Sequence, residues 1–155
     1  MGDRYLKSLR LLAECLQDFE RCSGEMARGC GLTHAQFDII ATLGNTPGMM
    51  YKELGEKTLI TKGTLTGVIE RLEQKGLVAR TRSCEDKRSF FVRLTPEGER
   101  MFAHAFPRML SMGRQLFASY TDSDFEAMDQ HLRRLKQTIA AHGTVPTLQQ
   151  QKESY

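Results

Sequence analysis

The side chains that could bind a ligand or a polyanion are concentrated between positions 61 and 88. Many of the residues in this segment are small and polar or cationic. The first group combines hydroxyl, glycine and basic residues: Thr61, Lys62, Gly63, Thr64, Thr66 and Arg71. The second group belongs to a short polar segment and contains three cations and one acid: Arg82, Asp86, Lys87 and Arg88. Hydroxyl and guanidinium groups hydrogen-bond to phosphate oxygens and base edges, so both groups are candidates for binding DNA.

A helix must position the first group. Its buried face is predicted from four apolar residues spaced i, i+3, i+4 and i+7: Leu65, Val68, Ile69 and Leu72. Thr61 is expected to cap the helix N-terminus, and Gly76 to end the helix in the left-handed conformation. Gly63 and Gly67 lie on the other face, where each costs up to ~1 kcal/mol relative to alanine. Close approach to a large partner explains these glycines better than the alternative, a tolerated surface defect.

The second group lies in a predicted β-hairpin. Residues 78–83 and 89–94 have β-strand composition, and the polar segment 84–88 separates them. Cations outnumber acids in this hairpin, with Arg80, Arg82, Lys87, Arg88 and Arg93 against Glu85 and Asp86. Such cations suit contact with phosphates and entry into a narrow minor groove. Asp86 is expected to hold the guanidinium of Arg88 in one pose. A solvated loop with an incidental ion pair is the alternative.

A short helix over residues 51–57 precedes these elements and is expected to pack through Leu54. Leu59 and Ile60 are expected to fill the turn that follows it. The order of helix, turn, helix and basic hairpin predicts a winged helix-turn-helix within a mainly α-helical protein. The alternative is an ordinary helical hairpin, which the basic β-hairpin makes the weaker interpretation.

These segments resemble the MarR family (multiple antibiotic resistance regulators). The resembling motifs are LTHAQFDIIATL at 32–43, TKGTLTGVIERLEQKGLV at 61–78, DKR at 86–88 and VRLTPEG at 92–98. The resemblance implies a homodimeric transcription regulator, usually a repressor that a small ligand or an oxidant releases. By position it places the residues of the first group in the family's major-groove helix. It makes Arg88 the minor-groove arginine of the wing and Asp86 its supporting acid, while Gly67 stands where many members carry a larger polar residue.

Amphipathic helices are predicted at both ends of the chain. The first, over residues 3–28, carries an apolar stripe that includes Leu9, Leu12 and Leu16. The last begins after Thr121, with Asp124 completing a capping box. Its stripe consists of Phe125, Met128, Leu132, Leu135 and Ile139. An intertwined dimer would bury both stripes, and an intramolecular bundle is the alternative; the resemblance favours the dimer.

Between the hairpin and the last helix, Thr95 and Pro96 are expected to begin a helix that reaches about residue 120. Pro107 should kink or interrupt it. The predicted organisation is therefore a helical dimerisation region (1–30 and 96–142), a winged helix-turn-helix DNA-binding region (31–95) and a polar, disordered tail (143–155).

The dimer prediction has consequences for the partners. Two recognition helices about one helical turn (~34 Å) apart would read a pseudo-palindromic operator in double-stranded DNA. A small-molecule effector that changes the spacing of the two helices would change operator affinity. Its pocket is expected between the dimerisation helices and the DNA-binding region, lined by residues of the first, second and fifth helices. No cofactor is predicted.

Four cysteines, at positions 15, 22, 30 and 84, raise the alternative of a redox-sensing regulator. Some MarR-family members sense peroxide through an N-terminal cysteine, and Cys15 and Cys22 lie in a comparable region. They are about 10 Å apart along one helix, so they could bond only across a dimer. Burial as small hydrophobic residues is the more common role. The four histidines are scattered, and no metal site is predicted.

Composition limits the remaining classes. The chain has 155 residues and a net charge of +3, so positive charge must be localised to attract a polyanion. No apolar run is long enough for a membrane span, and the N-terminus is too charged for a signal peptide, which predicts a cytoplasmic protein. No catalytic spacing stands out, so no enzyme is predicted. A winged helix that binds another protein is a further alternative.

Overall fold

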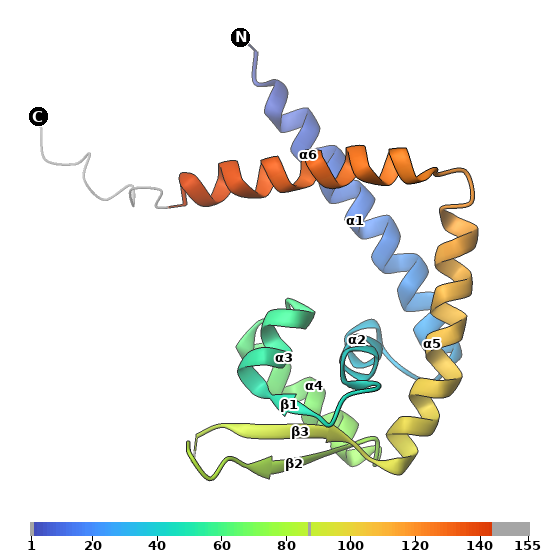
Figure 1. Ribbon diagram of the computed structural model, residues 1–155, viewed down its shortest axis with the longest axis vertical. Helices are drawn as coiled ribbons and strands as arrows, with labels where there is room; N and C mark the ends of the chain where they lie inside the picture. The colour runs from blue at the N-terminus through green and yellow to red at the C-terminus, as the bar shows by residue number, and fades with distance from the viewer. Residues whose placement is uncertain (1, 87, 144–155) are drawn as a thin grey trace, which may run out of the picture. The chain divides into compact units, whose positions relative to one another are not determined.

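The computed structural model describes residues 2–86 and 88–143. Its elements in chain order are α1 (Arg4–Gly29), α2 (His34–Leu43), β1 (Met49–Met50), α3 (Tyr51–Thr58), α4 (Lys62–Gln74), β2 (Val78–Arg82), β3 (Phe90–Leu94), α5 (Pro96–Leu116) and α6 (Asp122–Ala141) (Figure 1). The predicted fold class, mainly α with a small β wing, is confirmed. The chain forms two compact units, Met1–Gly113 and Arg114–Tyr155.

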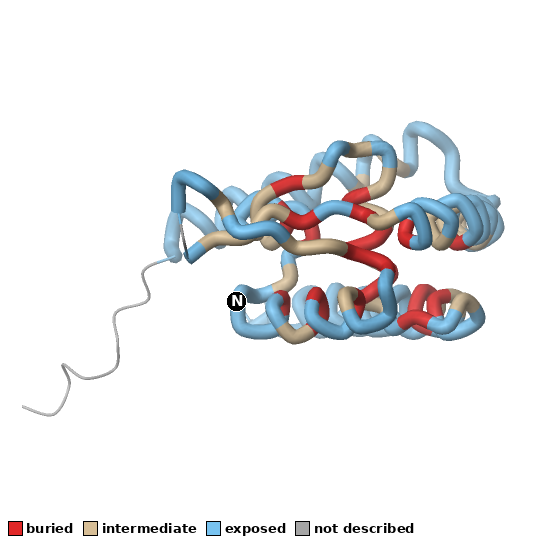
Figure 2. Tube along the Cα trace, turned by 90° about the horizontal axis from the view of Figure 1, so that it is seen from below, coloured by how far each residue is buried: buried red, intermediate tan, exposed pale blue. Residues whose placement is uncertain are grey.

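The elements from α2 to β3 form what we call the head. Its antiparallel sheet has the strand order β1-β3-β2, with Met49 paired to Val92 and Val78 paired to Leu94. The core side chains that are fully buried come from three helices and the central strand: Ile39, Ile40, Leu43, Leu54, Leu65, Ile69, Leu72 and Val92. Figure 2 shows the buried residues in red where helices and strands meet. The β2–β3 hairpin, which we call the wing, extends from this core.

The C-terminus of α4 forms as predicted. Gly76 has a φ of +73°, and its N–H donates to the carbonyl of Glu73, while the N–H of Leu77 donates to the carbonyl of Leu72. These two bonds define a Schellman motif. This motif requires a positive φ at its turning residue, which glycine adopts without strain. The next residues lead directly into β2. The glycine therefore sets the angle at which the wing leaves α4.

Thr95 joins the wing to α5. Its hydroxyl donates to the carbonyl of Gly76 at 2.6 Å and accepts the N–H of Gly98 at 3.1 Å, so it caps the helix as predicted. Gly98 is required by close packing, because a Cβ there would lie 2.0 Å from the carbonyl oxygen of Leu77. These contacts hold the start of α5 against the base of the wing.

One expectation for α5 is wrong, because the helix ends at Leu116 rather than near residue 120. Pro107 lies inside the helix and does not interrupt it, and a kink at this position stays a prediction. Proline removes one helical hydrogen bond. However, Ala105 is fully buried and Met109 packs against the core, so tertiary contacts on both sides of Pro107 hold the helical turn.

The turn between α3 and α4 also differs from expectation. Ile60 packs against the core, but Leu59 does not fill the turn, since it is 87% exposed. Leu59 adopts a φ of +58°, and this left-handed conformation turns the chain while its side chain faces solvent. The interior is closed instead by Thr58, which is buried and whose hydroxyl donates to the carbonyl of Leu54 at 2.7 Å.

The second unit contains α6. Thr121 and Asp124 form the predicted capping box. No residue of α6 is buried, and its stripe is partly or fully exposed, with Ile139 at 58% exposure. In α1 the stripe residues Leu9, Leu12 and Leu16 are exposed as well. Both predicted dimerisation stripes are thus uncovered in the single chain, and most of the predicted tail (143–155) lies outside the described residues.

Candidate nucleic-acid interface

The α4 helix separates an apolar face from an open edge. Its stripe is buried, with exposures between 0% and 8% for the four predicted residues. The predicted DNA-contacting residues of the first group are all exposed: Thr61, Lys62, Gly63, Thr64, Thr66 and Arg71. They share one accessible edge because the helical repeat places them away from the stripe.

The two glycines of this edge are not required by the fold. A Cβ added at Gly63 or Gly67 would meet nothing within 4 Å. Both glycines have helical backbone rather than positive φ, so neither sterics nor backbone strain within the chain demands them. The two glycines therefore lower the stability of the helix relative to alanine, and no contact within the chain compensates for this loss.

The N-terminus of α4 departs slightly from expectation. Thr61 has the extended backbone of an N-cap, but its side chain accepts no capping hydrogen bond. Its hydroxyl donates instead to the Thr64 hydroxyl at 3.2 Å. The first N–H groups of α4 are consequently without a side-chain acceptor from Thr61, and they lie at the positive end of the helix dipole.

The wing tip (residues 83–86, 88 and 89) is held by hydrogen bonds that its backbone N–H groups donate. The Ser83 hydroxyl accepts the N–H groups of Glu85 and Asp86, and the N–H of Ser83 donates to the carbonyl of Ser89. Asp86 accepts the backbone N–H of Arg88 at 3.0 Å. The expectation that Asp86 holds the Arg88 guanidinium is thus wrong within the described residues, because a two-residue separation favours an Asx turn. Arg88 is exposed, and Lys87 lies outside the described residues.

Arg80 is not a free phosphate-binding cation, contrary to its place among the wing cations. Its guanidinium donates to both carboxylate oxygens of Glu73, at 3.0 and 3.3 Å, and to the Tyr51 hydroxyl at 3.4 Å. It lies 4.9 Å from the centre of the Phe90 ring and 3.9 Å from the Glu70 carboxylate. The hydrogen bond to Glu73 is the main reason that the pKa of Arg80 is raised.

This network affects the charge of the interface. Glu70 and Glu73 are the acidic residues of α4, and both lie in its C-terminal half. Arg80 pairs with both of them. A polyanion that approaches α4 therefore meets neutralised acids and the exposed cations Lys62 and Arg71. Arg82, also exposed, places its guanidinium 5.5 Å from the centre of the Phe90 ring. The sequence shows Glu70 and Glu73 three residues apart on one helix. Their proximity to Arg80 depends on the fold and could not be predicted from the sequence.

The cysteines and histidines do not converge in the described residues. Cys15 is exposed and Cys22 half-buried on α1, and both are free thiols. His34 instead bonds to the buried Ser23 hydroxyl at 3.0 Å, which ties α2 to α1. The part of the chain that the structure describes holds no group of three residues suited to a metal. Redox sensing through Cys15 or Cys22 stays a prediction.

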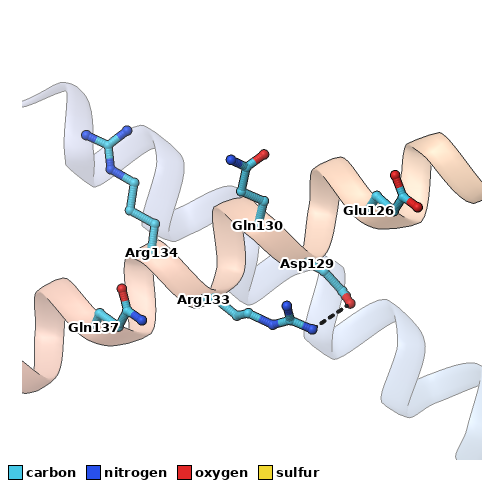
Figure 3. A pocket seen from close by; sticks show the side chains of 6 residues that line it. All are labelled: Glu126, Asp129, Gln130, Arg133, Arg134 and Gln137. Carbon is cyan, nitrogen blue, oxygen red and sulfur yellow. Dashed lines mark hydrogen bonds and ion pairs between the residues drawn. The ribbon is translucent and has the colours of Figure 1, made fainter.

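A shallow hollow of about 580 Å³ lies along α6 (Figure 3). Its lining is entirely polar or charged: Glu126, Asp129, Gln130, Arg133, Arg134 and Gln137. Arg133 and Asp129 form an ion pair at 3.3 Å, one helical turn apart. At 100° per residue, these side chains lie roughly opposite the apolar stripe of α6. The hollow has the character of a solvated helix face.

Comparison with known proteins establishes the family. The MarR family profile matches residues 32–90. The homoprotocatechuate degradative operon repressor of Escherichia coli is 32% identical over 109 residues, covering 70% of this chain and 72% of the repressor. The Escherichia coli transcriptional regulator HosA is 33% identical over 107 residues, covering 69% of this chain and 79% of HosA.

A solved structure agrees with these relatives. BpsR of Bordetella bronchiseptica, whose DNA binding is regulated by 6-hydroxynicotinic acid, superposes with a TM-score of 0.73 at 25% identity. The match covers 84% of this chain and 98% of the BpsR chain. The chain belongs to the MarR family of winged helix-turn-helix proteins. It is a transcriptional regulator rather than an enzyme. None of its described helices is both long enough and apolar enough to span a bilayer.

Proposed function

We propose that this regulator is a homodimeric repressor that binds a pseudo-palindromic operator through α4 and the wing. In this proposal α4 enters the major groove, and its base-facing and phosphate-facing residues are those of the open edge, from Thr61 to Arg71. The wing reaches the adjacent minor groove with Arg88, supported by Arg82 and Lys87, while Asp86 orders the tip.

One observation carries the DNA-binding proposal. The α4 edge is exposed except at the half-buried Gly67, contains two glycines with open space around them, and lies beside a wing tip with an exposed arginine. An α-helix fits the major groove, which is about 12 Å wide, and its backbone comes closest where side chains are smallest. The glycines that the fold does not need are explained by such an approach.

The exposed apolar stripes of α1 and α6 support the dimer. Leu16 is 57% exposed and Ile139 is 58% exposed, and the same holds in lesser degree for Leu9, Leu12 and Leu132. Two stripes of this size are normally covered in soluble proteins. A second copy of the chain would cover both and would place two α4 helices for successive major grooves, ~34 Å apart.

We further propose that a small aromatic acid releases the repressor. The DNA binding of BpsR is regulated by 6-hydroxynicotinic acid, and the Escherichia coli relative is named for the degradation of homoprotocatechuate. Both compounds are hydroxylated aromatic acids. The proposed pocket lies among α1, α2 and the part of α5 before residue 113. A ligand there would act by favouring dimers whose α4 spacing does not match the operator.

Duplex fragments captured from the genome of origin provide the operator for the decisive test. Arg88→Ala should weaken binding to it by about 1–3 kcal/mol, if the arginine enters a groove. Arg133→Ala, an exposed arginine of the α6 polar face, is the matched control and should bind like wild type. Fluorescence anisotropy measures both, and equal affinities for wild type and Arg88→Ala would remove the wing from the mechanism.

Salt dependence separates the DNA-binding proposal from the protein-interaction alternative. Affinity for duplex should fall steeply between about 50 and 200 mM salt, because phosphate contacts release counterions. A protein-interaction module would bind little duplex at any salt concentration. Addition of 6-hydroxynicotinic acid or homoprotocatechuate to the complex then tests the effector class, and release by neither would reject hydroxylated aromatic acids.

A further inference from the structure

A cleft separates the wing tip from the helices of the head. Its volume is about 540 Å³, and its lining comes from the start of α3, the turn before α4, the first turns of α4 and the wing tip. The apolar floor consists of Tyr51, Ile60 and Leu65. The rim carries the cations Lys52, Lys62 and Arg88. Lys52 was not among the residues predicted from the sequence to bind DNA.

The shape of duplex DNA indicates what this cleft accommodates. A major groove and the adjacent minor groove are separated by one sugar-phosphate strand. A protein that inserts α4 into the major groove and its wing into the adjacent minor groove must therefore straddle that strand. The cleft is lined by residues of α4 and of the wing tip, so it is the place where the strand would pass.

The charges of the rim suit such a strand. All three cations are exposed. Of the two acids in the lining, Asp86 already accepts the N–H of Arg88, which leaves Glu56 as the acid of the α3 side. Glu56 lies one helical turn from Lys52, so this pair defines the face of α3 that borders the cleft.

The neighbouring face of α3 provides a contrast. Lys57 pairs with Glu53 at 3.1 Å, also one turn apart. Neither residue lines the cleft, because both are rotated by about 100° from Lys52 and Glu56. The same short helix thus carries one lysine at the cleft and one lysine in a surface ion pair.

We propose that the cleft between α3, α4 and the wing seats one sugar-phosphate strand of DNA, and that Lys52 contacts a phosphate there. The proposal rests on the proposed DNA-binding function and extends the interface to α3. Tyr51 and Ile60 form an apolar floor beneath the sugar, and Lys62 and Arg88 approach the same strand from its two sides.

The test measures binding of a mixed-sequence 30-bp duplex from 50 to 200 mM KCl. Lys52→Ala should weaken binding and reduce the slope of log K against log salt by about 0.9 per bound head, the value for one phosphate contact. Lys57→Ala is the matched control and should keep the wild-type slope. Glu56→Lys should bind more tightly with a steeper slope, a gain that misfolding would not produce.

Each outcome bears on a different claim. A second duplex of unrelated sequence should show the same loss for Lys52→Ala; a loss on one duplex only would indicate a base contact and overturn the phosphate seat. Equal effects of Lys52→Ala and Lys57→Ala, or a wild-type slope for Lys52→Ala, would also overturn it. If wild-type protein shows no salt-dependent binding, the proposed function itself fails.

Discussion

Helices α4 and α6 both carry an apolar stripe at helical spacing, but the two stripes differ in burial. In α4, Leu65 and Ile69 are 2% and 0% exposed, because they belong to the hydrophobic core of the head. In α6, Leu132 and Ile139 are 42% and 58% exposed. Periodicity therefore identifies a helix face that must be covered, but it does not reveal whether the same chain or a second copy covers it.

The opposite faces of the two helices differ as well. The polar face of α6 has charges of both signs and an ion pair between Arg133 and Asp129, which is typical of a helix in contact with water. The outer edge of α4 has threonines and two glycines with open space around them. A face built for solvent does not require small residues, so the contrast supports a macromolecular partner for α4.

The largest effect is expected from breaking the α6 stripe. Leu132→Asp combined with Leu135→Asp places two charges on the proposed dimer interface, where burial of an unpaired charge is prohibitive. The variant should be monomeric in sedimentation velocity and should lose binding to a palindromic operator. The control is Gln130→Asp combined with Gln137→Asp on the polar face, which should remain dimeric. A stripe variant that still sediments as a dimer would show that the stripe packs within one chain.

The next effect concerns the α4 stripe. Leu72→Ala removes a fully buried side chain and should lower the free energy of unfolding by about 2–5 kcal/mol. Leu59→Ala, at 87% exposure, should change it by about 0.5 kcal/mol or less. Denaturant titration measures both values. Similar losses for the two variants would mean that Leu59 is covered in solution, and they would remove the contrast between stripe and turn.

Local features of this fold follow from the sequence. The α4 stripe, the glycine at position 76 and the capping box at Thr121 depend on spacings of two to seven residues, and each forms as predicted. Helix α1 likewise begins and ends within a residue of the predicted range. Interactions over such spacings are determined by helix geometry alone, which is why periodicity and capping preferences predict them.

Features that depend on tertiary placement were missed. The role of Arg80 requires Glu73, Tyr51 and Phe90 to meet around one guanidinium. Together with Arg80 these residues belong to four different elements. The cleft that includes Lys52 exists only because the fold brings the wing tip close to α3 and α4. Part of the candidate site, the α4 edge and the Arg88 tip, was thus predictable, whereas the network and cleft that shape it were not.

A smaller effect tests the meaning of the α4 glycines. Gly67→Ala should raise the free energy of unfolding by about 0.5–1 kcal/mol, because alanine favours the helix and the added methyl group meets no atom within 4 Å. If the edge approaches DNA closely, the same variant should bind the operator several-fold more weakly. Gly113→Ala on α5 is the matched control, since its Cβ also meets nothing and it should stabilise without loss of binding. A Gly67→Ala protein that binds like wild type would identify the glycine as a tolerated defect.

The smallest effect concerns the helix N-termini, where α6 has a complete capping box and Thr61 of α4 accepts no capping bond. The backbone N–H of Thr121 donates to the Asp124 carboxylate, and this bond is the main cause of a lowered pKa for Asp124. A carboxyl group whose pKa is lower in the folded state stabilises that state above its unfolded pKa, and this contribution is lost as the pH falls through the folded value. The melting temperature of wild type should therefore exceed that of Asp124→Ala at pH 6, and the difference should shrink below about pH 4. A difference that is the same at pH 6 and pH 3 would show that the carboxylate charge does not stabilise α6, and the contrast between the two helix caps would then rest on the Thr121 hydroxyl alone.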